Sequence, residues 1–271
     1  MSKIYPRSSA LNAQRERDRA DTHLMSQAPT IVDVQLATVA EGSVGLTGVL
    51  GIPAGSGPWP GVVLVHEAYG VNDVMRRQVA RAASAGYVAL MPDLFTDGGP
   101  RRCLMATFRA LRSGEGRAFV DISTARDFLT ARDDSTGKVG VLGFGMGGVF
   151  ALAAAAGHGF DASSANYGML PKDLDDDLRG ACPIVGSYGG RDKWLKGSVA
   201  KLEDSLTRLG VPHDLKEYPE AGHAFLNDAE SGPRPMRLLM KRFLGAGPNP
   251  EAATDAWQRI EAFFGEHLAA R

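Results

Sequence analysis

The sequence predicts an α/β fold, with a mostly parallel central sheet and helices on both faces. Short apolar segments of β type alternate with segments of helical periodicity from residue 31 almost to the end of the chain. Gly and Pro contribute 33 and 15 of the 271 residues, without any collagen-like period, and mark turns between these segments. No repeat or low-complexity linker interrupts residues 31–268. We therefore expect a polar, flexible extension over residues 1–30 and a single domain over residues 31–271.

Three β-type segments open this domain, at residues 31–36, 44–52 and 61–66, each bounded by Gly, Pro or Asn. A helix is expected over residues 71–85, because Asn72 or Asp73 can cap its start and Gly86 can end it. The apolar segment at residues 87–91 follows as a strand. The order of strand, helix and strand predicts a β-α-β unit.

Helical periodicity continues over residues 103–112 and 118–131. A short apolar strand at residues 138–144 then runs directly into a glycine-rich turn and an alanine-rich helix. The remaining expected strands cover residues 162–167, 184–188 and 214–218, and the remaining helices cover residues 199–209 and 252–268. Because strands and helices alternate to the end, we expect most of the strands to run parallel.

Composition excludes several classes of partner. The formal net charge is −1, so nothing attracts the chain to nucleic acid or to an anionic membrane. No segment approaches the roughly 18 apolar residues of a membrane-spanning helix. The two cysteines, Cys103 and Cys182, have no spacing typical of a metal site or a disulfide framework, and the N-terminal residues lack the apolar region of a signal peptide. We expect a cytoplasmic protein that acts on a small molecule and binds no metal.

The turn after the strand at residues 138–144 has the glycine spacing of a nucleophile elbow, G-x-Nu-x-G. In such an elbow a sharp strand-to-helix turn presents its middle residue above the sheet, and here that residue is Gly145. The next backbone N–H, from Met146, would lie at a helix N-terminus and help to stabilise an oxyanion. Glycine therefore provides the geometry of the elbow without a nucleophile.

The same turn also satisfies the dinucleotide-binding pattern GxGxxG, through Gly143, Gly145 and Gly148. That pattern requires an acidic residue near the end of the next strand, and here the strand ends in Asn166 and Tyr167. Dinucleotide binding is thus the less favoured hypothesis. A purely structural use of the glycines, in close packing of helix against strand, also stays open.

Two residues downstream have the chain order of a hydrolase triad, in which the acid and then the histidine follow the nucleophile. Asp192 lies in a loop after the strand at residues 184–188, and His223 lies in a loop after the strand at residues 214–218. Asp192 would orient one imidazole nitrogen of His223, and the other nitrogen would move a proton above Gly145. Ala68 follows the third strand, where the second oxyanion N–H of this fold usually comes from.

Five ordered motifs then resemble the dienelactone hydrolase family of α/β-hydrolases over residues 31–268. They are His66-Glu67-Ala68-Tyr69-Gly70-Val71-Asn72, Met91-Pro92-Asp93-Leu94-Phe95, Gly143-Phe144-Gly145-Met146-Gly147-Gly148, the Asp192 loop and Gly222-His223-Ala224-Phe225. The resemblance implies an α/β-hydrolase fold and hydrolysis of an ester or lactone through a covalent acyl intermediate, without a cofactor. It places the nucleophile, normally cysteine, at Gly145, the acid and base at Asp192 and His223, and the resting-state partner of the thiol at Glu67. Besides Glu67, we expect Tyr69, Tyr167 and Phe225 in the pocket.

Gly145 departs from the family pattern, because it cannot form an acyl-enzyme. Three accounts stay open: a hydrolase fold without the covalent chemistry, direct activation of water by His223, or a glycine that replaces an original cysteine or serine. From another class comes an inactive binding module for a small molecule or a protein, although a pure binder has no need of both Asp192 and His223. Asn227 stands shortly after the histidine, where the family tends to carry an arginine that binds the substrate carboxylate, so the pocket is expected to have diverged.

Overall fold

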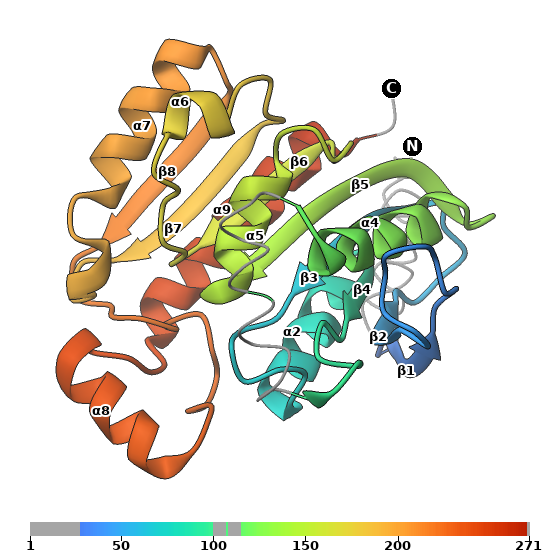
Figure 1. Ribbon diagram of the computed structural model, residues 1–271, viewed down its shortest axis with the longest axis horizontal. Helices are drawn as coiled ribbons and strands as arrows, with labels where there is room; N and C mark the ends of the chain where they lie inside the picture. The colour runs from blue at the N-terminus through green and yellow to red at the C-terminus, as the bar shows by residue number, and fades with distance from the viewer. Residues whose placement is uncertain (1–27, 100–106, 108–114, 270–271) are drawn as a thin grey trace, which may run out of the picture.

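One eight-stranded sheet runs through the described part of the protein, in the order β1-β2-β4-β3-β5-β6-β7-β8 (Figure 1). The computed structural model describes residues 28–99, 107 and 115–269. The strands are β1 (Thr30–Gln35), β2 (Thr47–Ile52), β3 (Trp59–Val65), β4 (Val88–Pro92), β5 (Ser135–Phe144), β6 (Ala162–Asn166), β7 (Ile184–Gly189) and β8 (His213–Tyr218).

The sheet is mostly parallel. Only β1 with β2 and β2 with β4 pair antiparallel, at one edge of the sheet. The other five pairings, from β4–β3 through to β7–β8, are parallel. Parallel strands bring their carboxyl ends to the same edge, so the loops that follow β3, β5, β7 and β8 are close in space.

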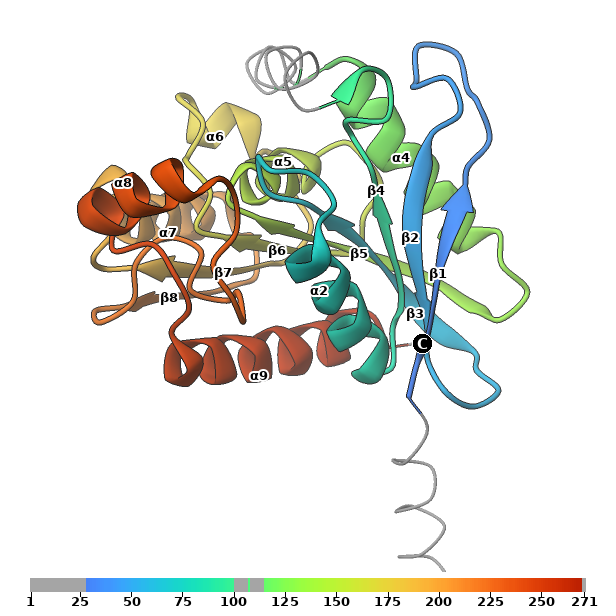
Figure 2. The same ribbon diagram turned by 90° about the horizontal axis from the view of Figure 1, so that it is seen from below.

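Helices cover both faces of this sheet (Figure 2). They are α2 (Asp73–Ser84) and α9 (Pro250–His267) on one face, and α4 (Arg117–Thr130), α5 (Met146–Ala154) and α7 (Ser198–Leu209) on the other. The 3-10 helix η1 (Lys193–Leu195) follows β7 and α8 (Arg234–Leu244) follows β8, whereas the short α6 (Leu174–Asp177) lies between β6 and β7 in the chain and packs against α7. This arrangement confirms the predicted α/β class. None of the helices in the described residues combines the length and the apolar character that crossing a bilayer would require.

The side chains of β3 show why the sheet needs helices on both sides. Val62 and Leu64 belong to the hydrophobic cluster under α2 and α9, and Val63 and Val65 belong to the cluster under α4 and α5. All four are completely buried. A strand whose alternate side chains are apolar on both faces is stable only when both faces are covered. Packing on both faces therefore holds the end of β3 rigidly, and the loop that carries Glu67 and Ala68 starts there.

Most of the predicted elements are present, with differences of one to three residues at their ends. Asn72 caps α2, since its side chain accepts a hydrogen bond of 3.1 Å from the backbone N–H of Met75. The second strand begins at Thr47 rather than residue 44, because Val44 is 74% exposed in the preceding loop. Thr30 already belongs to β1. The helix expected at residues 103–112, apart from residue 107, and the extension up to residue 27 lie outside the described residues. The sequence patterns did not predict α6, η1 and α8.

Candidate active site

Gly145 lies at the turn between β5 and α5, with φ +56° and ψ −111°. Side chains rarely adopt this left-handed backbone conformation, and glycine adopts it without strain. The turn is held by a hydrogen bond of 3.0 Å from the Gly145 N–H to the carbonyl oxygen of Asn166, at the end of β6. The turn therefore has the sharp backbone geometry of a nucleophile elbow and carries no side chain at its apex.

His223 reaches the space above Gly145. A Cβ atom built on Gly145 would lie 3.2 Å from Nε2 of His223 and 3.9 Å from Cγ of Glu67. The imidazole nitrogen is thus within hydrogen-bonding distance of the place where a nucleophilic side chain would begin. The loops after β5 and β8 are 78 residues apart in sequence at these two positions, and the parallel sheet brings them together.

Asp192 holds the other nitrogen of the same imidazole. Its Oδ2 lies 2.6 Å from Nδ1 of His223, and its Oδ1 accepts a hydrogen bond of 3.0 Å from the backbone N–H of Trp194. The Asp192 side chain is fully buried, and that of His223 is 19% exposed. With the Nδ1 proton directed to the buried carboxylate, Nε2 is the nitrogen left to accept a proton above Gly145. The structure therefore brings together Gly145, Asp192 and His223.

The backbone N–H groups of Ala68 and Met146 are the two predicted oxyanion donors. Ala68 follows β3, Met146 is the first residue of α5, and both line the same cavity. Neither N–H is hydrogen bonded to another residue that the structure describes. The first N–H groups of a helix lack partners within the helix, so that of Met146 is available to a bound group.

Glu67 is the carboxylate nearest to the apex of the turn. Its side chain is buried, and Oε1 accepts a hydrogen bond of 3.0 Å from Nδ2 of Asn227. Burial raises the pKa of Glu67 above its ordinary value, while His223 and the hydrogen bond from Asn227 oppose the increase. The Tyr167 hydroxyl also lowers this pKa from nearby, although it makes no hydrogen bond of regular geometry. An acidic proton is therefore retained at this position to higher pH than in an exposed glutamate.

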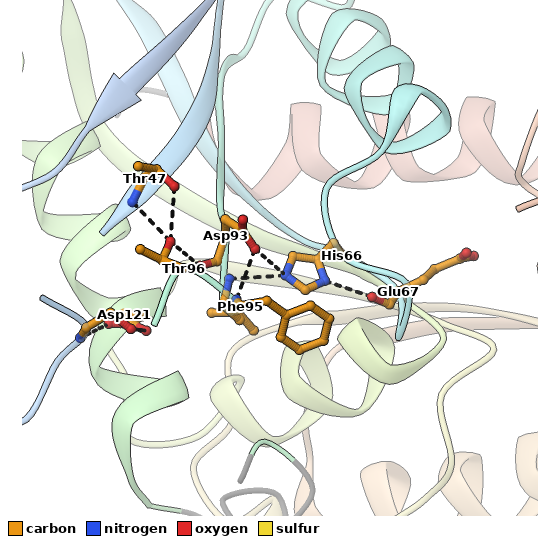
Figure 3. A network of polar contacts seen from close by, with 9 residues as sticks. Thr47, His66, Glu67, Asp93, Phe95, Thr96 and Asp121 are labelled. Carbon is orange, nitrogen blue, oxygen red and sulfur yellow. Dashed lines mark hydrogen bonds and ion pairs between the residues drawn. The ribbon is translucent and has the colours of Figure 1, made fainter. Parts of the chain in front are cut away.

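His66 fixes the backbone of Glu67 (Figure 3). Its Nε2 accepts a hydrogen bond of 3.1 Å from the backbone N–H of Leu94, so Nδ1 carries the proton and donates to the carbonyl oxygen of Glu67 at 2.7 Å. Burial lowers the pKa of His66, which favours this neutral form. The ring of Phe95 packs edge-on against the imidazole at 4.8 Å between centroids. His66 is thus a structural support and does not reach the cavity.

Tyr167 and Ala224 hold strained backbone conformations beside the turn. Their φ angles are +41° and +59°, values that non-glycine residues seldom adopt. Tyr167 is completely buried, its hydroxyl has no hydrogen-bond partner, and its ring lies edge-on to His223 at 5.2 Å between centroids. Backbone strain and unpaired buried polar atoms both gather at functional sites, because folding alone would select against them.

A cavity of about 170 Å³ opens above Gly145 and His223. Of the residues expected around it, Glu67, Ala68, Tyr69, Met146 and Tyr167 line its wall. The wall also includes the apolar side chains of Met169, Trp194 and Met240, and the single Arg237. Its size and largely apolar wall suit a small organic molecule with few polar groups.

Phe225 is a correction to the predicted pocket. It is completely buried in the core, where its ring packs against Tyr167 and Tyr218 at centroid distances of 5.6 and 5.0 Å, and it does not line the cavity. The left-handed conformation of Ala224 reverses the chain between His223 and Phe225. As a result Ala224 faces the cavity, and the next side chain turns away from it.

Residues of α8 were missed as part of the site. Arg237 and Met240 line the cavity, and the Nε of Arg237 is buried without a hydrogen-bond partner, while its Nη1 lies 3.6 Å from Glu230. A signal for this helix was present in the sequence, since Pro235 suits the first turn of a helix and Gly245 suits its end. The C-terminal end of α8 also holds the loop that carries His223, because the Leu244 carbonyl accepts a hydrogen bond of 3.1 Å from the His223 N–H.

No metal centre is present in the described part of the chain, in which no three His, Cys, Asp or Glu side chains are arranged to hold an ion. Cys182 lies away from the cavity, and burial raises the pKa of its thiol to about 12. Such a thiol is almost entirely protonated at neutral pH and is a poor nucleophile. Cys103 lies outside the described residues.

The raised pKa of Glu67 predicts how Glu67→Gln changes stability with pH. Below about pH 4 the carboxyl is protonated in both the folded and the unfolded chain, so the variant should melt close to the native protein. As pH rises above the ordinary pKa of 4.5, only the unfolded chain ionises, which destabilises the native protein and not the variant. We expect melting curves between pH 4 and 8 to show an increasing advantage for Glu67→Gln. An advantage that is constant across this range would contradict the raised pKa.

Comparison with known proteins places this geometry in a family. The model of the dienelactone hydrolase family matches residues 46–268 of the chain. A protein of Methylorubrum extorquens named "putative carboxymethylenebutenolidase" is 28% identical over 236 residues, which cover 80% of this chain and 75% of the relative. A protein of Yersinia pestis with the same name is 27% identical over 230 residues, with coverage of 78% and 80%.

Solved structures agree with this assignment. The dienelactone hydrolase of Anabaena variabilis has a TM-score of 0.64 and 25% sequence identity, covering 90% of this chain and all of that one. A dienelactone hydrolase-like promiscuous phosphotriesterase from metagenomic libraries has the same fold, with a TM-score of 0.71 and 23% identity, covering 90% of this chain and 100% of that one. The fold is therefore that of an α/β-hydrolase. Since the family model covers most of the sequence, and since the elbow, the acid and the histidine follow in the family's order, the chain belongs to the dienelactone hydrolase family.

Proposed function

We propose that this protein hydrolyses a small carboxylic ester or lactone by direct attack of water, with His223 as general base. The observation that carries the proposal is the distance of 3.2 Å between Nε2 of His223 and the Cβ position of residue 145. With glycine at this position, a water molecule fits where the nucleophilic side chain of the family would be. It would then lie within reach of an imidazole whose other nitrogen is held by Asp192.

The step begins when the water oxygen attacks the carbonyl carbon of the substrate. As the C–O bond forms, Nε2 of His223 takes one proton from the water, and the buried carboxylate of Asp192 stabilises the resulting imidazolium. The carbonyl oxygen becomes an oxyanion, which the N–H groups of Ala68 and Met146 stabilise. When the tetrahedral intermediate collapses, the C–O bond breaks and its electron pair stays on the leaving oxygen, which gains one proton and so balances the proton that His223 took from the water. An ester gives an acid and an alcohol, and a lactone gives one hydroxy acid.

The cavity supports a small and mostly apolar substrate. Its volume of about 170 Å³ accommodates a molecule of a few heavy atoms around the ester group. Among the described residues that line it, Arg237 is the only lysine or arginine. We therefore assign esters and lactones of short acids to this site.

The proposal predicts the effects of substitutions in the His223–Asp192 pair on hydrolysis of p-nitrophenyl acetate. We expect His223→Ala to reduce kcat/KM to the background rate, because His223 is the only histidine among the described residues that line the cavity. Asp192→Asn should lower kcat/KM by about 10²–10⁴-fold, since the amide no longer selects the productive tautomer. His267→Ala, at the end of α9 and outside the cavity, is the matched control and should hydrolyse the ester at the native rate.

Pre-steady-state traces separate this mechanism from covalent catalysis. Direct attack by water releases p-nitrophenol without a burst, because no acyl-enzyme accumulates. Full activity of His223→Ala would overturn the proposal. A stoichiometric burst from the native protein would also overturn it, because it would show that a protein side chain and not water attacks the ester.

A further inference from the structure

Glu67 flanks the same space above Gly145 as His223 does, from a different element. The Cβ position of residue 145 lies 3.9 Å from Cγ of Glu67, and Glu67 lines the cavity. His223 comes from the loop after β8, whereas Glu67 comes from the loop after β3. Two groups that can carry protons therefore border the position at which water would attack.

One oxygen of the Glu67 carboxyl accepts a regular hydrogen bond, and the Tyr167 hydroxyl lies near the group without making one. Oε1 accepts a hydrogen bond from Nδ2 of Asn227, and no hydrogen bond joins Oε2 to another residue that the structure describes. The His66 imidazole holds the backbone carbonyl of Glu67, and the Asn227 amide holds one oxygen of its carboxyl. The carboxyl is thus positioned, yet it can still present an O–H to a bound molecule.

The geometry points to Glu67 as a second catalytic residue, which donates a proton to the leaving oxygen as the ester or lactone bond breaks. This inference rests on the proposed function. A tetrahedral intermediate carries its attacking and leaving oxygens on different corners, and His223 contacts the corner from which the water arrives. An acid on another loop can reach the leaving oxygen without any movement of the imidazole.

The proton transfers balance with this assignment. His223 accepts one proton from the attacking water, and Glu67 gives its proton to the leaving oxygen as the C–O bond breaks and that oxygen takes the bonding electrons. The imidazolium then returns its proton to the Glu67 carboxylate, directly or through water. Each turnover consumes one water and one ester, releases one acid and one alcohol, and restores both groups.

The surroundings of Glu67 favour the protonated form that this role requires. Burial raises the pKa of the carboxyl. His223, the Asn227 amide and the Tyr167 hydroxyl face the group and oppose that increase. Tyr69 also lines the cavity, and burial together with the Glu67 charge raises the pKa of its phenol, so it stays neutral. A carboxyl whose proton is held by burial, beside a histidine whose Nδ1 is bonded to Asp192, is a pairing typical of acid–base catalysis.

The test compares two leaving groups in the native protein and in Glu67→Gln. Nitrophenolate leaves without help, whereas an alkoxide needs a proton. We therefore expect Glu67→Gln to lower kcat/KM for ethyl acetate at least about tenfold more than it lowers kcat/KM for p-nitrophenyl acetate. The matched control is Asp121→Asn, which alters another buried carboxyl of raised pKa, hydrogen bonded to Ser43 and outside the lining of the cavity. It should leave the ratio of the two rates unchanged.

A pH profile of the native protein tests the same role without any variant. The ratio of kcat/KM for ethyl acetate to that for p-nitrophenyl acetate should fall as pH rises through the pKa of Glu67. Equal losses on both esters in Glu67→Gln, or a pH-independent ratio, would overturn the inference. Either result would leave the proposed function intact provided that His223→Ala still abolishes hydrolysis, so the two failures are distinguishable.

Discussion

Gly145→Cys should turn the protein into a faster esterase that works through an acyl-enzyme. The new Cβ would lie 3.2 Å from Nε2 of His223, so the imidazole can deprotonate the thiol once the two groups have adjusted by a few tenths of an ångström. Loss of the nucleophile from a complete triad lowers kcat by several orders of magnitude. We therefore expect kcat/KM for p-nitrophenyl acetate to rise by at least about 10²-fold, with a burst of one nitrophenol per protein.

Two controls test whether the faster hydrolysis by Gly145→Cys comes from a thiol activated by His223. The double variant Gly145→Cys with His223→Ala should lose both the burst and the extra turnover, because its thiol has no base. Iodoacetamide should label Gly145→Cys more rapidly than the native protein, whose Cys182 thiol is buried with a pKa of about 12. The φ of +56° imposes strain of about 1–3 kcal/mol on any side chain at this position, so folding is checked by thermal melting. A folded variant without a burst would show that His223 is not placed to serve residue 145.

Gly147→Ala should strongly destabilise the protein. A Cβ on Gly147 would lie 2.0 Å from the carbonyl oxygen of Val65 and 2.6 Å from its carbonyl carbon, where α5 crosses the end of β3. Both neighbours are backbone atoms of buried elements, so the helix itself must move away from the sheet. We expect a loss of at least about 3 kcal/mol in the free energy of unfolding, measured by urea denaturation.

Gly265→Ala is the matched control for this variant. Gly265 lies in α9, and a Cβ there would meet no other atom within 4 Å. Because glycine is a poor helix former, its replacement should stabilise the protein by about 0.5–1 kcal/mol. Replacing glycine by alanine should thus lower the free energy of unfolding at position 147 and raise it at position 265. If Gly147→Ala had the same urea midpoint of unfolding as the native protein, the close packing of α5 against β3 would be refuted.

The sequence by itself determined the order of the elements and the positions of Gly145, Asp192 and His223 along the chain. Apolar periodicity identified the strands, because buried parallel strands require continuous apolar segments. Strand order also constrained the site, since loops at the carboxyl ends of parallel strands share one edge of the sheet. The sequence alone therefore assigns the elbow, the Asp192 loop and the His223 loop to one edge of the sheet.

Only the tertiary structure decided which side chains enter the cavity. Phe225 turns into the core because Ala224 adopts φ +59°, and nothing local in the sequence reveals that angle. Arg237 lines the cavity because α8 lies over the site, a placement set by contacts between distant segments. The burial of Glu67, and with it the retention of its proton, likewise depends on side chains from other loops. Apolar periodicity depends on neighbours in the sequence and so predicts local backbone structure. The burial of a side chain, its distance from another group and the charge around it depend on residues that only folding brings together.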